Sequence, residues 1–156
     1  GVFPAFIGEH SQLANIDDVF NGVLIRGDAT GDVVFYGRGA GKFPTASAVV
    51  ADMIDVAKAN TTSKSLSWED SAENHVVDIQ TVPFSFYLRF CSERGDECEA
   101  QLRELFPDST WLARKKQPEN EWAFVTPVMT ELELQKRLSR LNEADRLLNR
   151  IRLLDY

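Results

Sequence analysis

The stretch from Val33 to Ala59 constrains the fold most, because it joins a strand pattern, a glycine-rich turn and a helical pattern. Residues 33–36 are apolar β formers. Pro44 suits the first turn of a helix, where its missing N–H would be unpaired anyway. Three glycines lie between, at alternate positions: Gly37, Gly39 and Gly41. The helix that follows carries one apolar face, formed by Ala46, Val49, Val50, Met53 and Ala57.

A glycine loop that runs into a helix N-terminus presents free backbone N–H groups and a positive dipole end, which suits a phosphate group. The spacing here is GxGxG, which differs from the dinucleotide fingerprint GxGxxG. Gly41-Lys42-Phe43 also lacks the Ser or Thr that follows the lysine of a P-loop. From spacing alone, a tight strand-to-helix turn therefore remains the alternative to a phosphate site.

The residue types of this stretch resemble a family motif. YGRGAGKFPTASAVVAD, residues 36–52, resembles the YGPGAG-x-x-PTASAVV-x-D motif near the end of the catalytic region of homoserine dehydrogenase. NGVLIRGDATG, residues 21–31, resembles the N-A-V-x-V-x-G-D-x-x-G strand and turn of the same family. Arg38 replaces the proline of the motif, which should loosen the turn. The resemblance covers residues 1–60 and continues more weakly toward the C-terminus.

Composition excludes several other classes of protein. The 156 residues include 17 basic and 24 acidic side chains, so the net charge of −7 does not favour nucleic-acid binding. No apolar run is long enough to span a bilayer, and no signal peptide is visible. Cys91 and Cys98 do not form a disulfide framework or a metal knuckle, and His10 and His75 are isolated. We therefore expect a cytoplasmic protein with reduced thiols, no metal, no membrane partner and no nucleic-acid partner.

Before the central stretch, residues 2–7 predict an edge strand and residues 8–17 a loop. Residues 20–26 predict a strand that pairs with residues 33–36 as a hairpin. After the helix, residues 61–74 are polar and rich in serine, which predicts a linker or exposed loop.

The second half predicts its own set of elements. Phe84, Phe86, Leu88 and Phe90 alternate with polar or smaller residues, which indicates a strand with one buried face. Thr130 and Glu133 form a capping-box pattern at a helix start. The predicted elements are a strand at 84–91, a helix at 96–106, strands at 111–116 and 121–128, a helix through Leu141 and a strand at 148–154.

This β-α-β-β-α-β order predicts a ferredoxin-like domain, an antiparallel sheet with both helices on one face. An RNA-recognition motif has the same order but needs a basic surface and an aromatic motif, and both are missing. After the glycine motif, this pattern resembles the ACT domain, a regulatory module of many bacterial homoserine dehydrogenases. Residues 87–89 and 125–126 resemble its first and third strands.

The predicted fold class is α+β. Residues 1–60 are interpreted as a partial α/β piece of the catalytic and dimerisation region, residues 61–83 as a linker, and residues 84–156 as an ACT-like domain able to fold alone. The chain begins with Gly1 inside an apolar pattern, which suggests a piece of a longer protein.

The ACT loop after the first strand usually reads D-x-P-G-V-L, whereas residues 92–98 read SERGDEC. Gly95 occupies the glycine position, but the proline and the aliphatic pair are missing. The resemblance implies effector contacts, with threonine the expected amino acid, at Glu93, Gly95 and Asp96. A purely structural ACT-like domain is the alternative.

The resemblance implies an NAD(P)-dependent enzyme that reduces aspartate 4-semialdehyde to L-homoserine, in threonine and methionine biosynthesis. It assigns no catalytic residue to this chain, because the catalytic lysine and the substrate-binding acidic residues of the family precede this region. It assigns cofactor contact to Gly41, with Gly39 and Ala40 in the same loop. We expect a bound cofactor only in the longer enzyme.

The second hypothesis is a non-enzymatic regulatory or dimerisation module that binds an amino acid. Under either hypothesis the exposed strand edges predict a homo-oligomer, most simply a two-fold dimer.

Overall fold

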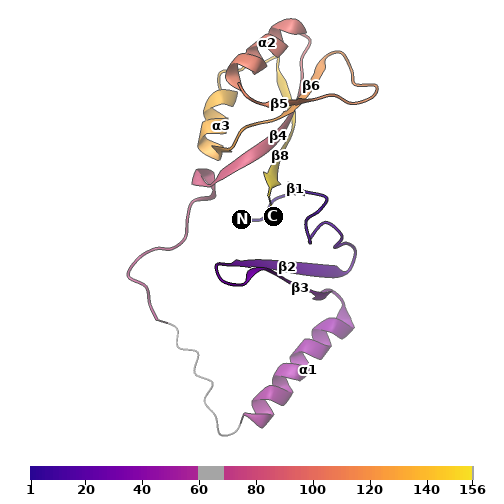
Figure 1. Ribbon diagram of the computed structural model, residues 1–156, viewed down its shortest axis with the longest axis vertical. Helices are drawn as coiled ribbons and strands as arrows, with labels where there is room; N and C mark the ends of the chain where they lie inside the picture. Colours follow the sequence, from indigo (N-terminus) through magenta and orange to yellow (C-terminus); the bar gives the residue numbers. More distant parts are fainter. Residues whose placement is uncertain (60–68, 156) are drawn as a thin grey trace. The chain divides into compact units, whose positions relative to one another are not determined.

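The computed structural model describes residues 1–59 and 69–155 and divides the chain into two compact units (Figure 1). The sheet unit combines Gly1–Gly8 with His75–Tyr156, and the glycine-loop unit comprises Glu9–Asn74. In chain order the described elements are β1 (Ala5–Ile7), β2 (Phe20–Gly27), β3 (Gly31–Arg38), α1 (Lys42–Lys58), the 3₁₀ turn η1 (Ile79–Thr81), β4 (Pro83–Cys91), α2 (Asp96–Leu105), β5 (Thr110–Leu112), β6 (Glu121–Val125), β7 (Met129–Thr130), α3 (Glu131–Leu138) and β8 (Arg146–Leu154).

The sheet unit contains a 6-stranded sheet. Five of its strands are in the order β1-β8-β4-β6-β5, and the sixth, β7, pairs with β4 outside this order. β4 is antiparallel to both β6 and β8, whereas β1 runs parallel to β8. Helices α2 and α3 lie on the same side of the sheet (Figure 1). Apart from the short strand β7 between β6 and α3, the order β4-α2-β5-β6-α3-β8 agrees with the predicted β-α-β-β-α-β order. β1 makes the sheet mixed.

The core of the sheet unit lies between the sheet and its two helices. Phe86, Leu88 and Phe90 alternate along β4 and are fully buried, as their period of two predicts. Cys98 and Leu102 of α2 face them and are buried equally well. The remaining buried apolar residues of this cluster are Leu105, Phe106, Trp122, Phe124, Met129 and Leu134.

The glycine-loop unit is a β2–β3 hairpin followed by α1. One face of the hairpin is covered locally, since a Cβ atom on Gly22 would overlap the side chain of Ile16. The other face carries the cross-strand pair Val23 and Phe35, whose exposed fractions are 57% and 61%. No residue of α1 is buried, although its sequence predicts an apolar face. Within the described residues, this unit therefore leaves apolar surface uncovered.

Several predicted boundaries differ from the structure. β5 ends at Leu112 instead of residue 116, and the chain turns at residues 115–116, where Lys116 has a φ of 60°. β6 ends at Val125 instead of residue 128, because Pro127 has no N–H for a sheet hydrogen bond. Leu141 lies beyond α3, which ends at Leu138.

Two further differences concern the ends of the glycine-loop unit. The first strand is an edge strand as predicted, but it belongs to the sheet unit because β1 pairs with β8. β3 continues to Arg38, so Gly37 lies inside a strand and the loop is shorter than predicted. Residues 60–68 of the predicted linker lie outside the described residues. The functional assignment of the ranges 1–60, 61–83 and 84–156 stays a prediction.

Candidate functional site

The glycine loop joins β3 to α1 and is held by the hairpin. Asn21 of β2 is opposite Gly37 of β3, and a Cβ atom on Gly39 would overlap the amide of Asn21. The rings of Phe20 and Tyr36 are stacked, with centroids 4.9 Å apart. Gly39 is therefore required by close packing inside the hairpin, which fixes where the loop leaves it.

Gly41 determines how the chain enters α1. Its φ of 112° and ψ of 157° lie in a region that essentially only glycine adopts. From the first turn of α1, the N–H and the hydroxyl of Thr45 both donate to the Gly41 carbonyl, at 3.2 Å and 2.9 Å. These two bonds fix Gly41 at the start of α1.

The N-terminus of α1 is suited to an anion. The first N–H groups of a helix have no acceptor within it, and no side chain caps α1. Its first turn contains no acidic residue, whereas Lys42 is its first residue. A groove of about 580 Å³ runs beside the loop, lined by Val19, Arg38, Ala40, Gly41, Lys42, Phe43, Pro44 and Ser47.

The structure brings together part of the predicted cofactor loop. Gly41 and Ala40 line the groove, whereas Gly39 does not and packs against Asn21 instead. Two cationic side chains that the motif did not single out, Arg38 and Lys42, also line it. The groove can accept a phosphate-bearing group through backbone N–H groups and two positive charges. The cofactor contacts of Gly39, Ala40 and Gly41 stay a prediction.

The predicted effector residues share the loop between β4 and α2. Gly95 has a φ of 55° and caps α2, and Asp96 is the first residue of that helix. Glu93 is exposed and accepts a hydrogen bond from the Asn120 amide at 3.4 Å. The exposed carboxylates of Glu93 and Asp96 can meet a cation from solvent. Their effector role stays a prediction.

Sequence reasoning missed the carboxylate that anchors this loop. The buried side chain of Asp145 accepts hydrogen bonds from Ser92 at 2.6 Å and from the Arg94 guanidinium at 2.7 Å. Arg94 also donates its backbone N–H to Ser92 Oγ at 3.1 Å. No sequence signal links Asp145 to a loop some fifty residues earlier, because the contact arises from tertiary packing.

The same carboxylate changes the protonation of a buried thiol. Burial and the neighbouring Asp145 carboxylate raise the pKa of Cys98 to about 11. Burial alone would raise the pKa of Asp145 as well, but hydrogen bonds from Ser92 and Cys98 and the charge of Arg94 lower it below its usual range. Cys98 is therefore a protonated, inert core residue at neutral pH.

A second buried carboxylate joins α3 to β8. Glu131, at the start of α3, is 3% exposed and accepts hydrogen bonds from Arg150 and, at 2.7 Å, from Arg152. The guanidinium carbon of Arg152 lies 4.3 Å from the centroid of the Phe3 ring and 5.5 Å from that of Phe84. Within the sheet unit, this cluster connects the N-terminal segment to β4, β8 and α3.

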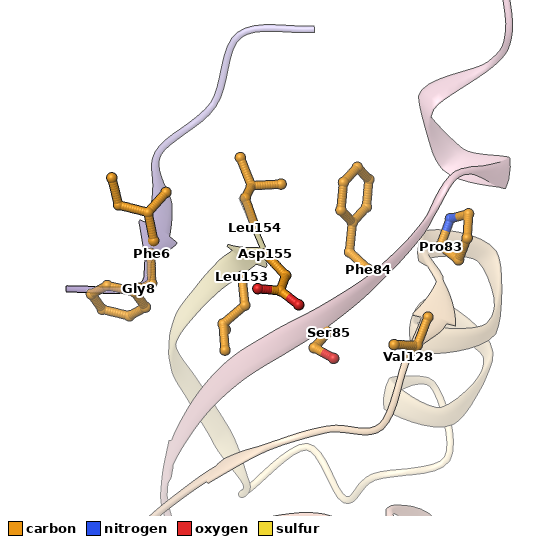
Figure 2. Close-up of a pocket in the computed structure, with 10 residues that line it drawn as sticks. Phe6, Gly8, Pro83, Phe84, Ser85, Val128, Leu153, Leu154 and Asp155 are labelled. Carbon is orange, nitrogen blue, oxygen red and sulfur yellow. The ribbon is translucent and has the colours of Figure 1, made fainter. Parts of the chain in front are cut away.

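A cavity of about 570 Å³ is lined by residues of β1, β4 and β8 and by Val128. Figure 2 shows these side chains. Its lining is mainly apolar and includes Phe6, Phe84, Val128 and Leu154, with Asp155 as its acidic residue. It contains no set of groups arranged for acid–base or nucleophilic chemistry. In the described part of the chain, no group of three or more His, Cys, Asp or Glu side chains could hold a metal ion. No described helix is long and apolar enough to cross a membrane.

Comparison with known proteins relates both units to one family. The family model of homoserine dehydrogenase matches residues 1–54. The homoserine dehydrogenase of Synechocystis sp. is 42% identical over 96 residues, which cover 57% of this chain and 22% of the relative. That of Pseudomonas aeruginosa is 38% identical over 114 residues, covering 69% of this chain and 26% of the relative.

A solved structure extends the similarity to nearly the whole chain. The crystal structure of a homoserine dehydrogenase from Thiobacillus denitrificans matches 97% of this chain with a TM-score of 0.73 and 29% identity, and the match covers 38% of that structure. The chain therefore spans about a quarter of the curated relatives that it matches and just over a third of the solved structure.

Because burial and the neighbouring Asp145 carboxylate raise the pKa of Cys98, the free energy of unfolding should fall at alkaline pH. The folded state holds the Cys98 proton up to about pH 11, whereas an unfolded thiol releases it near pH 8.5. The stabilising contribution is therefore complete below about pH 8.5 and is lost as the pH rises through about 11. Urea unfolding of the chain should show a free energy that declines over this window.

The matched variants are Cys98→Ala and Cys91→Ala. Cys98→Ala should remove most of the decline, whereas Cys91→Ala should keep it, because Cys91 is a half-buried thiol without this carboxylate contact. An equal alkaline decline in both variants would contradict the account of Cys98.

Proposed function

We propose, from the premise that this chain is a homoserine dehydrogenase fragment whose residues 1–54 match the family model, that it is the C-terminal portion of an NAD(P)-dependent homoserine dehydrogenase. The enzyme interconverts L-homoserine and aspartate 4-semialdehyde in the cytoplasm, in the pathway to threonine and methionine. The matched stretch includes the hairpin, the glycine loop and most of α1. This portion contributes to the nucleotide site, while the catalytic residues lie in the remainder of the enzyme.

The shape of the loop at Gly41 is the observation that carries this proposal. A φ of 112° favours glycine, so no side chain extends from this position, which lines the groove. The first N–H groups of α1 have no acceptor within the helix and no side-chain cap. Arg38 and Lys42 add positive charge at the same groove. NAD(P) supplies the hydride chemistry when it is bound. The residues of this chain position its phosphate-bearing part and contribute no proton transfer.

The sheet unit is proposed to be the ACT-like domain of this enzyme. Its β-α-β-β-α-β order and the sheet order β8-β4-β6-β5 support this proposal. Because Ser92 and Arg94 are anchored to Asp145, the loop presents Glu93 and Asp96 to solvent from a fixed backbone. Binding of threonine there would place its ammonium group beside these carboxylates. A non-enzymatic amino-acid-binding module remains the alternative, and the first experiment below separates the two.

The enzyme proposal predicts that activity depends on the remainder of the protein. The isolated chain should not oxidise L-homoserine, because hydride transfer requires cofactor and substrate held together. The intact protein that carries this chain should do so with NAD or NADP. Within it, Gly41→Ala should raise the KM for the cofactor about tenfold or more, which corresponds to a loss of about 1.4 kcal/mol of binding.

Gly37→Ala is the matched control for Gly41→Ala. Gly37 is a glycine of the same motif, but its backbone needs no positive φ and a Cβ atom there meets nothing within 4 Å. Equal cofactor KM values for the two variants would contradict a special role of Gly41. An intact protein without dehydrogenase activity would favour the binding-module alternative.

We also propose that the chain forms a two-fold dimer through the exposed face of the β2–β3 hairpin. Val23 and Phe35 on this face are uncovered in the described structure, and Ile25 and Val33 form the next cross-strand pair. Light scattering should give twice the chain mass, and Phe35→Asp should reduce it to a monomer or make the chain insoluble. Val77→Asp, at an exposed valine outside the hairpin, should leave the mass unchanged. A monomeric wild-type chain would contradict the dimer.

A further inference from the structure

A small cavity of about 180 Å³ is lined by residues of β4 and β6 and by the segment from the end of β5 to Gln117. Along β4, Phe86, Leu88 and Phe90 point toward the helices, so the alternating residues Tyr87 and Arg89 belong to the opposite face. Both line the cavity. The cavity is formed entirely by residues of the sheet unit, so it does not depend on the glycine loop or its proposed function.

Strand register explains why there is space at this position. Arg89 of β4 is opposite Ala123 of β6, which is opposite Leu112 of β5. These residues form one cross-strand row on the uncovered face. The methyl group of Ala123 is short compared with the side chains on both sides of it. The row therefore has a gap in its middle, between a cationic and an apolar neighbour.

The turn after β5 forms a fixed wall of the cavity. The Gln117 amide donates to the Glu121 carbonyl at 2.7 Å and accepts the Arg114 backbone N–H at 3.1 Å. The Arg114 guanidinium donates to the Glu121 carboxylate at 3.0 Å. These bonds hold Arg114 and Gln117 at the cavity without using all the N–H donors of Arg114.

The charges around the cavity do not cancel. Arg89 Nε lies 3.8 Å from the same Glu121 carboxylate, which is too long for a hydrogen bond. This nitrogen is buried and has no hydrogen-bond partner within residues 1–59 and 69–155. Two guanidinium groups therefore share one carboxylate, and the site keeps one net positive charge with a donor unused.

We propose that this cavity binds a small monocarboxylate with a short hydrocarbon body. Its carboxylate would accept hydrogen bonds from the guanidinium groups of Arg89 and Arg114, whose planar forks fit this group. Its hydrocarbon body would occupy the gap above Ala123, beside Leu112. A single negative charge matches the net charge of the site. A dianionic phosphate would meet stronger repulsion from Glu121, and an amine would be repelled by the two arginines.

Butyrate is the probe that tests this site on the complete chain. The Nε–H resonance of Arg89 should shift saturably in nitrogen-15 NMR spectra as butyrate is added. Inorganic phosphate and butylamine should bind at least about tenfold more weakly, as expected for an unfavourable charge contact in a confined site. Arg140→Gln removes a charge at an exposed arginine after α3 and should leave the butyrate affinity unchanged.

Two variants act on different parts of the site. Arg89→Gln should weaken butyrate binding about tenfold or more by removing a charge-assisted hydrogen bond. Ala123→Leu should weaken it as much by filling the gap while keeping both arginines. In Arg89→Gln, which lacks the Arg89 resonance, backbone amide resonances monitor binding. If Arg89→Gln does not fold, the affinity of Ala123→Leu decides the test. Failure of wild-type binding to saturate, unchanged affinity in a folded cavity variant, or tighter binding of phosphate than butyrate would each overturn the proposal.

Discussion

Burial of one face of β4 is the interaction on which the sheet unit depends. Phe86, Leu88 and Phe90 are fully buried between the sheet and its helices, and β4 pairs with both β6 and β8. Each such side chain contributes roughly 1.5–3 kcal/mol when it is fully buried. Because the central strand unites two neighbouring strands and two helices, these contacts also determine the position of the β4–α2 loop and of the small cavity on the opposite face.

The polar network around Asp145 depends on this apolar framework. Ser92 follows the last residue of β4, and Cys98 is part of the buried face of α2, so packing of both elements brings their side chains to one carboxylate. A buried carboxylate without donors would be costly. Here the hydroxyl, the thiol and the guanidinium satisfy it, and the loop acquires a fixed shape. Glu131 is a second buried carboxylate that is satisfied by donors. It connects α3 to β8 through hydrogen bonds from Arg150 and Arg152.

The glycine-loop unit is organised by backbone geometry more than by burial. Gly39 is fixed by contact with Asn21, and Gly41 by its positive φ, so local sequence largely determines the loop. In contrast, α1 has no buried residue in the described structure, and the outer face of the hairpin is exposed. The aligned stretches cover 22% and 26% of two curated relatives, so those proteins contain further residues that can contact the corresponding surface.

Sequence reasoning predicted the features that arise from local patterns. Alternation predicted β4, the spacing of Thr130 and Glu133 predicted the capping box of α3, and the glycine motif predicted the β3–α1 turn. It could not predict that β1 pairs with β8, since strand pairing over such a separation leaves no local signal. Asp145 was missed for the same reason, and so was the cavity above Ala123, whose arginines are brought together by strand register.

Hydrogen exchange, compared between this chain and the intact enzyme, tests most directly the difference between the two units. In the isolated chain, diluted until monomeric, the amides of β4 should exchange only through global unfolding, whereas those of α1 should exchange much faster. In the intact enzyme, α1 should become strongly protected because its apolar face gains partners. Protection of α1 equal to that of β4 in the isolated monomer would contradict the account, since it would show that the glycine-loop unit is complete by itself.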